Sequence, residues 1–210
     1  QNINKLYGIS TSYINELVVM FDKNYEKRTS KNRKMNYEIN LYKISKDNSS
    51  RFLLGNVGNK TLFVVGLNPS TANEEKPDLT LSKVMGFASK NNYDGFVMLN
   101  LYPKRETDPS ELPKNENDEI LEQNYSEIKS LLEEFKNFDI LASWGENISR
   151  RDYLKKSLTE ISKIVEQNNG KWKKIGELTK SGHPRHPSRI AYSEKINEFN
   201  ITEYINGLKN

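Results

Sequence analysis

The sequence has no cysteine, and only two of its 210 residues are histidines. The lack of cysteine excludes disulfides, thiolate zinc sites and iron–sulfur clusters. No stretch approaches the ~18 apolar residues of a membrane span. The apolar run INELVVMF near the start is too short and too acidic for a signal peptide. We therefore expect a soluble, cytoplasmic protein with no membrane partner.

Charge is abundant and slightly unbalanced. Charged residues make up 29% of the chain and hydrophobic residues 35%, and the net charge is +4. This balance is compatible with a polyanionic partner without requiring one. One basic cluster stands out in EKRTSKNRK, residues 26–34, and its cations are Lys27, Arg28, Lys31, Arg33 and Lys34. It is either a solvated loop or an arm that contacts phosphates.

The spacing of apolar residues predicts alternating strands and helices. Expected helices cover residues 9–27, 80–91, 117–136, 149–170 and 193–208. Expected strands lie within residues 36–44, 94–103, 138–145 and 171–178, and residues 51–67 are expected to form a strand, a Gly-Asn turn and a second strand at 61–67. This alternation predicts an α/β fold, a three-layer sandwich with a central, mostly parallel sheet. We expect an N-terminal helix and basic extension over residues 1–35, followed by a single domain over residues 36–210.

Ligands of such sheets bind at the carboxyl ends of the strands, so the residues after each predicted strand are the candidate site. Four short polar segments follow the predicted buried strands. They are GLNPST at 66–71, NLYPKR at 100–105, WGEN at 144–147 and GHPRHPS at 182–188. We expect them to meet in one crevice.

The last of these segments contains both histidines, His183 and His186, each followed by proline. A metal site would need further ligands, and no third histidine and no cysteine exists to supply them. A Ser/His/Asp hydrolase would need a G-x-S-x-G elbow, which is absent. A rigid loop that presents an imidazole to a developing anion remains, beside a purely structural role for either histidine.

The other segments each allow a functional and a structural interpretation. Asn100 has the donors and acceptor to read the edge of a planar base, or it caps a loop. Tyr102 is a stacking face or a core residue, and Trp144 at a strand end is more typical of a supporting core residue. Ser70 and Thr71 either cap a helix or donate to a phosphate, and Arg105 is a candidate phosphate ligand.

In order along the chain, LNPSTA, NLYPKRETDPSEL, SWG and LTKSGHPRHPS resemble the domain-of-unknown-function family 1643 over roughly residues 50–192. More distantly, the same order is similar to the uracil-DNA glycosylase superfamily. There a G-x-[DN]-P loop handles the attacking water, L-L-N reads the base, and H-P-S supports the departing base anion. GLNP, MLN and HPS match these motifs.

The resemblance implies roles for individual residues. Asn68 would position the attacking water, and His186 would donate to the base anion. Asn100 would read the base, and Ile190 would be the wedge, the side chain that pushes into the duplex. Because the first loop has no Asp, Asp78 or Asp108 would supply a carboxylate. Asn117 and Asp118 would line an altered pocket. Further base-binding candidates are Tyr102, Trp144 and His183. Candidates for contacts to nucleic acid are Ser70, Thr71, Arg105, Arg185, Ser188 and Arg189.

The leading hypothesis is therefore a monomeric, cofactor-free and metal-free DNA glycosylase that removes a uracil-like or modified pyrimidine from a flipped nucleotide. The alternative is a module on the same fold that binds a nucleotide or modified base without cleaving it. A phosphohydrolase or nuclease ranks last, because no segment supplies the paired carboxylates that hold metal ions.

Overall fold

A seven-stranded sheet forms the centre of the structure, a computed structural model that describes residues 35–208. Its strand order is β1-β2-β4-β3-β5-β6-β7. The strands are β1 (Leu41–Ile44), β2 (Arg51–Asn56), β3 (Thr61–Gly66), β4 (Gly95–Asn100), β5 (Asp139–Ala142), β6 (Lys171–Ile175) and β7 (Ile196–Glu198). The predicted helix at 9–27 and the basic cluster at 26–34 lie outside the described residues.

The sheet is mixed, which corrects the prediction of a mostly parallel one. β3 pairs in parallel with β4 and β5, and β5 pairs in parallel with β6. β1, β2 and β7 are antiparallel to their neighbours. Although β2 and β3 are joined by a short turn, they do not pair, because β4 lies between them. The predicted parallel sheet is thus confined to the four central strands.

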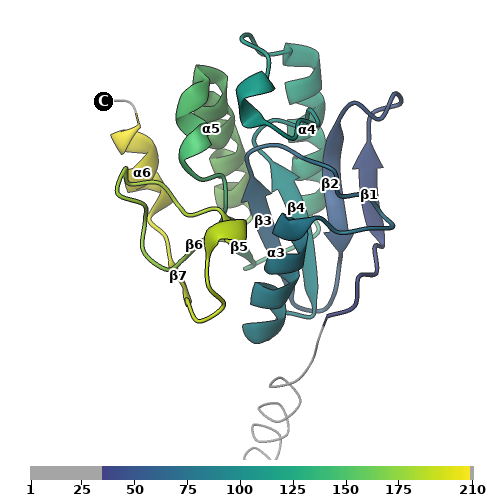
Figure 1. Ribbon diagram of the computed structural model, residues 1–210, viewed down its shortest axis with the longest axis vertical. Helices are drawn as coiled ribbons and strands as arrows, with labels where there is room; N and C mark the ends of the chain where they lie inside the picture. The colour runs from purple at the N-terminus through teal and green to yellow at the C-terminus, as the bar shows by residue number, and fades with distance from the viewer. Residues whose placement is uncertain (1–34, 209–210) are drawn as a thin grey trace, which may run out of the picture. The chain divides into compact units, whose positions relative to one another are not determined.

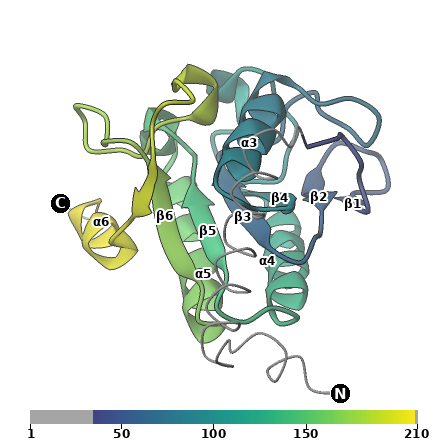
Figure 2. The same ribbon diagram turned by 90° about the horizontal axis from the view of Figure 1, so that it is seen from below.

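Helices cover both faces of this sheet, as the alternating pattern predicts (Figures 1 and 2). α3 (Leu79–Lys90) packs on one face, and α4 (Asp118–Leu132) and α5 (Asp152–Gln167) pack on the other. β3 and β4 are buried along their whole length because both of their faces are covered. None of the helices described in residues 35–208 is long and apolar enough to cross a bilayer.

Polar caps set where two of these helices begin. The Asp78 carboxylate accepts a hydrogen bond from the Leu81 amide (2.8 Å) and starts α3. The Asn117 side chain accepts one from the Ile120 amide (3.1 Å) and starts α4. Such caps satisfy amides that have no partner within the helix. The cap at Asp78 places the first turn of α3 at the edge of the sheet where the parallel strands end.

The C-terminal tail differs from the predicted single helix over 193–208. It forms β7, which adds to the free edge of β6, and then the short helix α6 (Ile201–Gly207). Phe199 between them is buried in the core, and the Asn200 side chain caps α6 by accepting from the Glu203 amide (3.1 Å). The unpaired backbone groups of β6 and the cap at Asn200 together divide the tail into a strand and a helix.

Candidate functional site

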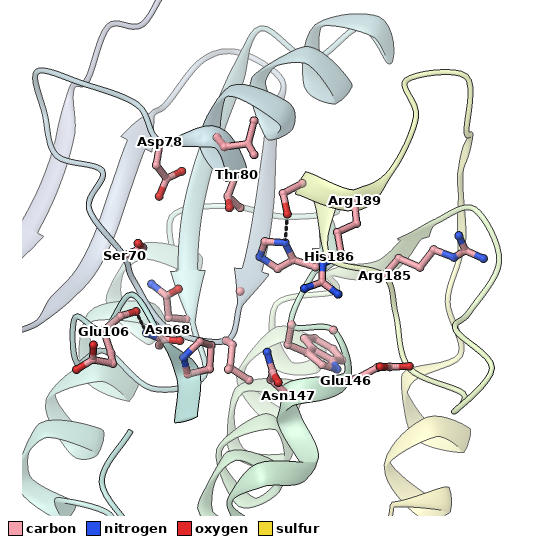
Figure 3. A pocket seen from close by; sticks show the side chains of 18 of the residues that line it. Asn68, Ser70, Asp78, Thr80, Glu106, Glu146, Asn147, Arg185, His186 and Arg189 are labelled. Atoms are coloured by element: carbon pink, nitrogen blue, oxygen red, sulfur yellow. Dashed lines mark hydrogen bonds between the residues drawn. The ribbon is translucent and has the colours of Figure 1, made fainter. Parts of the chain in front are cut away.

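A pocket of about 800 Å³ opens at the carboxyl ends of the parallel strands (Figure 3). Its wall includes residues 66–68 and 70 after β3, Asn100 at the end of β4, residues 144–147 after β5 and parts of residues 179–189 after β6. The structure therefore brings all four predicted segments together in one crevice. The reason is topological, because parallel strands end at the same edge of the sheet.

Asn68 lines the pocket with its amide fixed in place. Its Nδ2 donates to the backbone carbonyls of Glu106 (2.7 Å) and Pro69 (3.0 Å). These two bonds use both amide hydrogens, and the side-chain carbonyl oxygen makes no hydrogen bond to the described residues. The pocket thus receives a fixed acceptor from Asn68 (Figure 3).

His186 lies across the pocket from Asn68, and its Nδ1 is 2.8 Å from the Ser188 hydroxyl (Figure 3). Its Nε2 makes no hydrogen bond to the described part of the chain. Burial, and then the positive charge of Arg189, lower the pKa of His186 below its ordinary value, while Asp78 partly opposes this shift. The imidazole is therefore neutral at neutral pH and has one nitrogen free to meet a ligand.

Asn100 is 1% exposed and lines the floor of the pocket. Its Nδ2 is buried and has no hydrogen-bond partner among the described residues. A Cβ added to Gly66 would lie 3.1 Å from the Asn100 side-chain oxygen, so the lack of a side chain at Gly66 leaves room beside this amide. A buried donor without a partner costs free energy in the empty pocket, and a ligand acceptor would relieve that cost.

Of the two predicted carboxylates, only Asp78 lines the pocket. Asp108 is exposed and caps the short 3₁₀ helix at Pro109–Glu111, where it accepts from the Ser110 amide (2.8 Å). Hydrogen bonds from Ser110 lower the pKa of Asp108. Its turn-capping position explains why Asp108 does not reach the site.

Two of the predicted base-binding rings do not line the pocket. Tyr102 is 1% exposed and does not line the pocket, because its ring packs 4.9 Å from that of Tyr153 in the core. His183 does not line it either. The His183 Nδ1 is 2.8 Å from the Tyr204 hydroxyl and its Nε2 is 3.2 Å from the Ser149 hydroxyl, so both ring nitrogens have structural partners. Burial lowers the pKa of His183.

Trp144 lines the pocket but acts mainly as its support. It is 1% exposed, packs against Trp172, and donates from Nε1 to the Tyr204 hydroxyl (3.0 Å). The following Gly145 has φ +68°, a conformation that strongly favours glycine, and a Cβ there would lie 3.4 Å from the His186 Cβ. This turn after β5 therefore holds the histidine loop close to the sheet edge.

Several predicted phosphate ligands have structural roles instead. Arg105 does not line the pocket, and it donates to the carbonyls of Ser70 and Ala72 and to the Tyr42 hydroxyl. Thr71 is exposed outside the pocket lining. The Ser188 hydroxyl is engaged with His186. Ser70 does line the pocket, and its hydroxyl makes no hydrogen bond to the described residues.

Arg185 and Arg189 are exposed at the rim (Figure 3). The predicted wedge Ile190 is 3% exposed and packs in the core with residues of α3. The large apolar side chain exposed at the rim is instead that of Leu79, at 66%. Asn117 and Asp118 belong to the start of α4 and do not line the pocket.

The sequence patterns did not reveal several pocket residues. They are Arg51, Thr80, Glu106, Arg150 and Lys180, whereas Asn147 lies within the predicted WGEN segment. Glu146 also lines the pocket, within the predicted WGEN segment. Arginines and Lys180 give the lining more positive than negative side chains, which favours an anionic ligand.

One of the missed residues, Arg51, could have been found from the sequence. It is an arginine at the start of an otherwise apolar strand, which is an unusual position for a charge.

Within residues 35–208, no group of three histidine or acidic side chains gathers where it could hold a metal ion. The pocket lining offers the amides of Asn68, Asn100 and Asn147, the neutral imidazole of His186, the carboxylates of Asp78, Glu106 and Glu146, and the cations named above.

Comparison with known proteins places the chain in a family without assigning it an activity. The family described as protein of unknown function (DUF1643) matches residues 51–188, which include every motif of the pocket. No curated protein and no solved structure matches the chain significantly. Because the match covers more than half of the sequence, the chain belongs to the DUF1643 family.

Proposed function

We propose that the protein is a DNA glycosylase that hydrolyses the N-glycosidic bond of a uracil-like or modified pyrimidine, with the target base flipped into the pocket. The observation that carries the proposal is the convergence of Asn68, Asn100 and His186 on one pocket. Each of these side chains has a polar atom without a partner among the described residues. Three such groups suit a polar, planar ligand.

The departing base leaves as an anion, and His186 is the group suited to stabilise it. In the tautomer that this role requires, the Ser188 hydroxyl donates to Nδ1 and Nε2 carries the proton. A neutral imidazole that donates from Nε2 stabilises developing negative charge without first giving up its own proton. The lowered pKa of His186 supports this neutral form.

Asn100 is suited to read the base edge. Its buried Nδ2 would donate to a carbonyl of the pyrimidine, while its side-chain oxygen would accept from a ring N–H. A site that leaves a buried donor unpaired in the absence of the right base discriminates strongly against ligands that cannot accept this bond. The gap beside Gly66 lets the ligand come close to the strand end.

Asn68 is suited to orient the attacking water, because its amide nitrogen donates to two backbone carbonyls and this fixes the position of its side-chain oxygen. In the reaction the water oxygen forms a bond to C1′, and the C1′–N bond electrons leave with the base. One water proton must be accepted, and Asp78 and Glu106 are the carboxylates that line the pocket near these groups (Figure 3). The departing base then takes up a proton.

The rim supports binding to DNA. Arg150, Lys180, Arg185 and Arg189 are exposed cations around the opening, suited to a phosphate backbone. Leu79 has an exposed apolar side chain that would fill the gap that a flipped base leaves in the base stack. The resemblance gave this role to Ile190.

A non-catalytic module that binds a nucleotide or modified base is the alternative. It is favoured by one observation, that one oxygen of Asp78 is used to cap α3 rather than being free to accept a proton. Both functions use Asn100 and the pocket, and they differ in whether the bond to the base is broken.

The two functions are separated by a base-release assay without added metal. DNA carrying uracil, mismatched thymine or hypermodified cytosines is incubated with the native protein and then treated with alkali. Alkali-labile abasic sites with the native protein, lost in His186→Ala and Asn68→Ala, would establish the glycosylase and identify its base. Binding that depends on Asn100 without release from any substrate would leave the recognition module.

A further inference from the structure

A buried guanidinium forms part of the pocket wall. Arg51 is the first residue of β2, and it is 3% exposed while lining the pocket. It lies at the site because β2 runs antiparallel to β4, so the beginning of β2 is adjacent to the end of β4. The Arg51 amide donates to the Pro103 carbonyl (2.9 Å), which fixes the backbone there.

This charge is poorly compensated by the protein. The Arg51 Nη1 donates to the Ala72 carbonyl (2.7 Å), while Nε is buried without a partner among residues 35–208. No carboxylate of the described chain lies within 4.0 Å of the guanidinium. Buried charges are normally paired, because removing an ion from water costs several kcal/mol. Burial lowers the pKa of Arg51 to about 10, which still leaves it charged at neutral pH.

The neighbourhood of Arg51 contains a second positive charge, that of Arg105, instead of a paired carboxylate. The Arg105 Nη1 donates to the same Ala72 carbonyl (3.1 Å), and the positive charge of Arg105 also lowers the pKa of Arg51. Asp78 is the carboxylate that acts on Arg51 from nearby, and it is held as the cap of α3. Two guanidinium groups and one carboxylate leave the surroundings of Arg51 positive, and of the two arginines only Arg51 lines the pocket.

A purely structural role does not account for this arrangement. If Arg51 served only to hold the Ala72 carbonyl, Arg105 would already supply that contact from a less buried position. A buried second arginine would then add a desolvation cost without a matching contact. The first turn of α3, with Leu79 and Thr80, lines the same pocket, and the amino-terminal end of a helix favours anions.

We propose that Arg51 is an anion receptor in the pocket wall, which binds a phosphate group of the nucleotide ligand. That the anion is a nucleotide phosphate rests on the proposed function. That the pocket wall binds an anion is inferred from the buried, uncompensated charge of Arg51. The exposed Arg185 and Arg189 attract a backbone from outside. Arg51 instead binds one phosphate at a defined place inside the pocket, whose wall also includes Ser70 and the start of α3.

The test measures melting temperature and binding by calorimetry, with the full chain at constant ionic strength. The probes are inorganic phosphate and deoxyuridine 5′-monophosphate, compared with chloride and with deoxyuridine, which lacks the phosphate. We expect both phosphate probes to raise the melting temperature of the native protein above that in chloride. Arg51→Met should lose this response and bind the monophosphate roughly ten- to a hundredfold more weakly, as expected for a bond to a charged group.

Arg105→Met is the matched control. It removes the other donor to the Ala72 carbonyl but leaves the pocket lining intact, so it should lower the melting temperature while keeping the response to phosphate. If Arg51→Met does not fold, Arg51→Lys keeps the charge without the planar fork and should show a weaker response. A native protein that responds equally to phosphate and chloride, or a folded Arg51→Met that binds the monophosphate as the native protein does, overturns the proposal.

The same variants separate this inference from the proposed enzyme. Phosphate-dependent binding through Arg51 without base release from any DNA would keep the anion receptor and reject the glycosylase. Base release by Arg51→Met with an unchanged KM would keep the glycosylase and reject the receptor.

Discussion

The Nδ1 of His186 lies 2.8 Å from the hydroxyl of Ser188, two residues later in the chain. This bond fixes the orientation of the ring. The Nε2 makes no hydrogen bond to the described residues and is left for a ligand in the pocket. Between these two residues, Pro187 limits the backbone freedom of the loop. The pair is therefore a local device that orients one imidazole.

From this pair we expect a graded effect of mutation. Ser188→Ala removes the orienting bond, worth about 1 kcal/mol, and should lower kcat about fivefold without changing the pH at which activity is highest. The measurement is single-turnover base release on the substrate identified first. A loss as large as that of His186→Ala would show that Ser188 acts on the substrate directly.

Asn100 should show opposite effects on stability and function. Asn100→Leu replaces a buried, unpaired amide with an apolar side chain of similar volume. We expect the free energy of unfolding to stay the same or rise by ~1 kcal/mol, while binding of the base is lost. Denaturant unfolding and ligand titration measure the two effects. A large loss of stability would mean that the Asn100 side chain holds the strand end together.

Asp78 combines a cap with a pocket carboxylate, and one substitution separates the two. Asp78→Asn preserves the cap, because asparagine caps helices as well as aspartate does. If Asp78 accepts the proton of the attacking water, kcat should fall at least a hundredfold with an unchanged melting temperature. Asp108→Asn is the matched control outside the pocket and should keep full activity. Full activity of Asp78→Asn would assign the proton acceptor to another group, such as Glu106.

Stability should decrease on mild acidification because of the histidines. Folding lowers the pKa of both His183 and His186, so the unfolded chain binds more protons below the ordinary histidine pKa of about 6.5. More protons on the unfolded state make the free energy of unfolding fall as the pH falls through this value. Melting curves between pH 7.5 and 5.5 measure the decrease, and His186→Gln should reduce it. A decrease of the same size in His186→Gln would contradict this origin.

The sequence was sufficient to predict the location of the pocket but not all of its walls. Asn68, Asn100 and His186 were predictable because each lies at or after the end of a strand of the parallel centre. Arg51 was missed because it begins an antiparallel strand, and such a strand starts at the edge where its parallel neighbours end. That relationship depends on β4 lying between β2 and β3, a pairing that no local pattern specifies.

Side-chain neighbours explain the remaining differences. Tyr102, His183 and Ile190 follow strands or motifs as expected, yet each is buried against residues distant in the sequence. The direction in which a loop side chain points depends on which apolar or polar group it meets there. The strand β7 was missed for a similar reason, because its formation needs the free edge of β6.

The most direct test of the central claim is the rate of base release by native protein and His186→Gln under single-turnover conditions at pH 7.5. The glutamine amide can still donate a hydrogen bond but does not match the imidazole's geometry. If His186 stabilises the departing base anion, the native protein releases the base and the variant is slower by roughly a hundredfold or more, with similar affinity for the DNA. Equal rates for the two proteins, or no release by the native protein from any of the DNA substrates, would contradict the account.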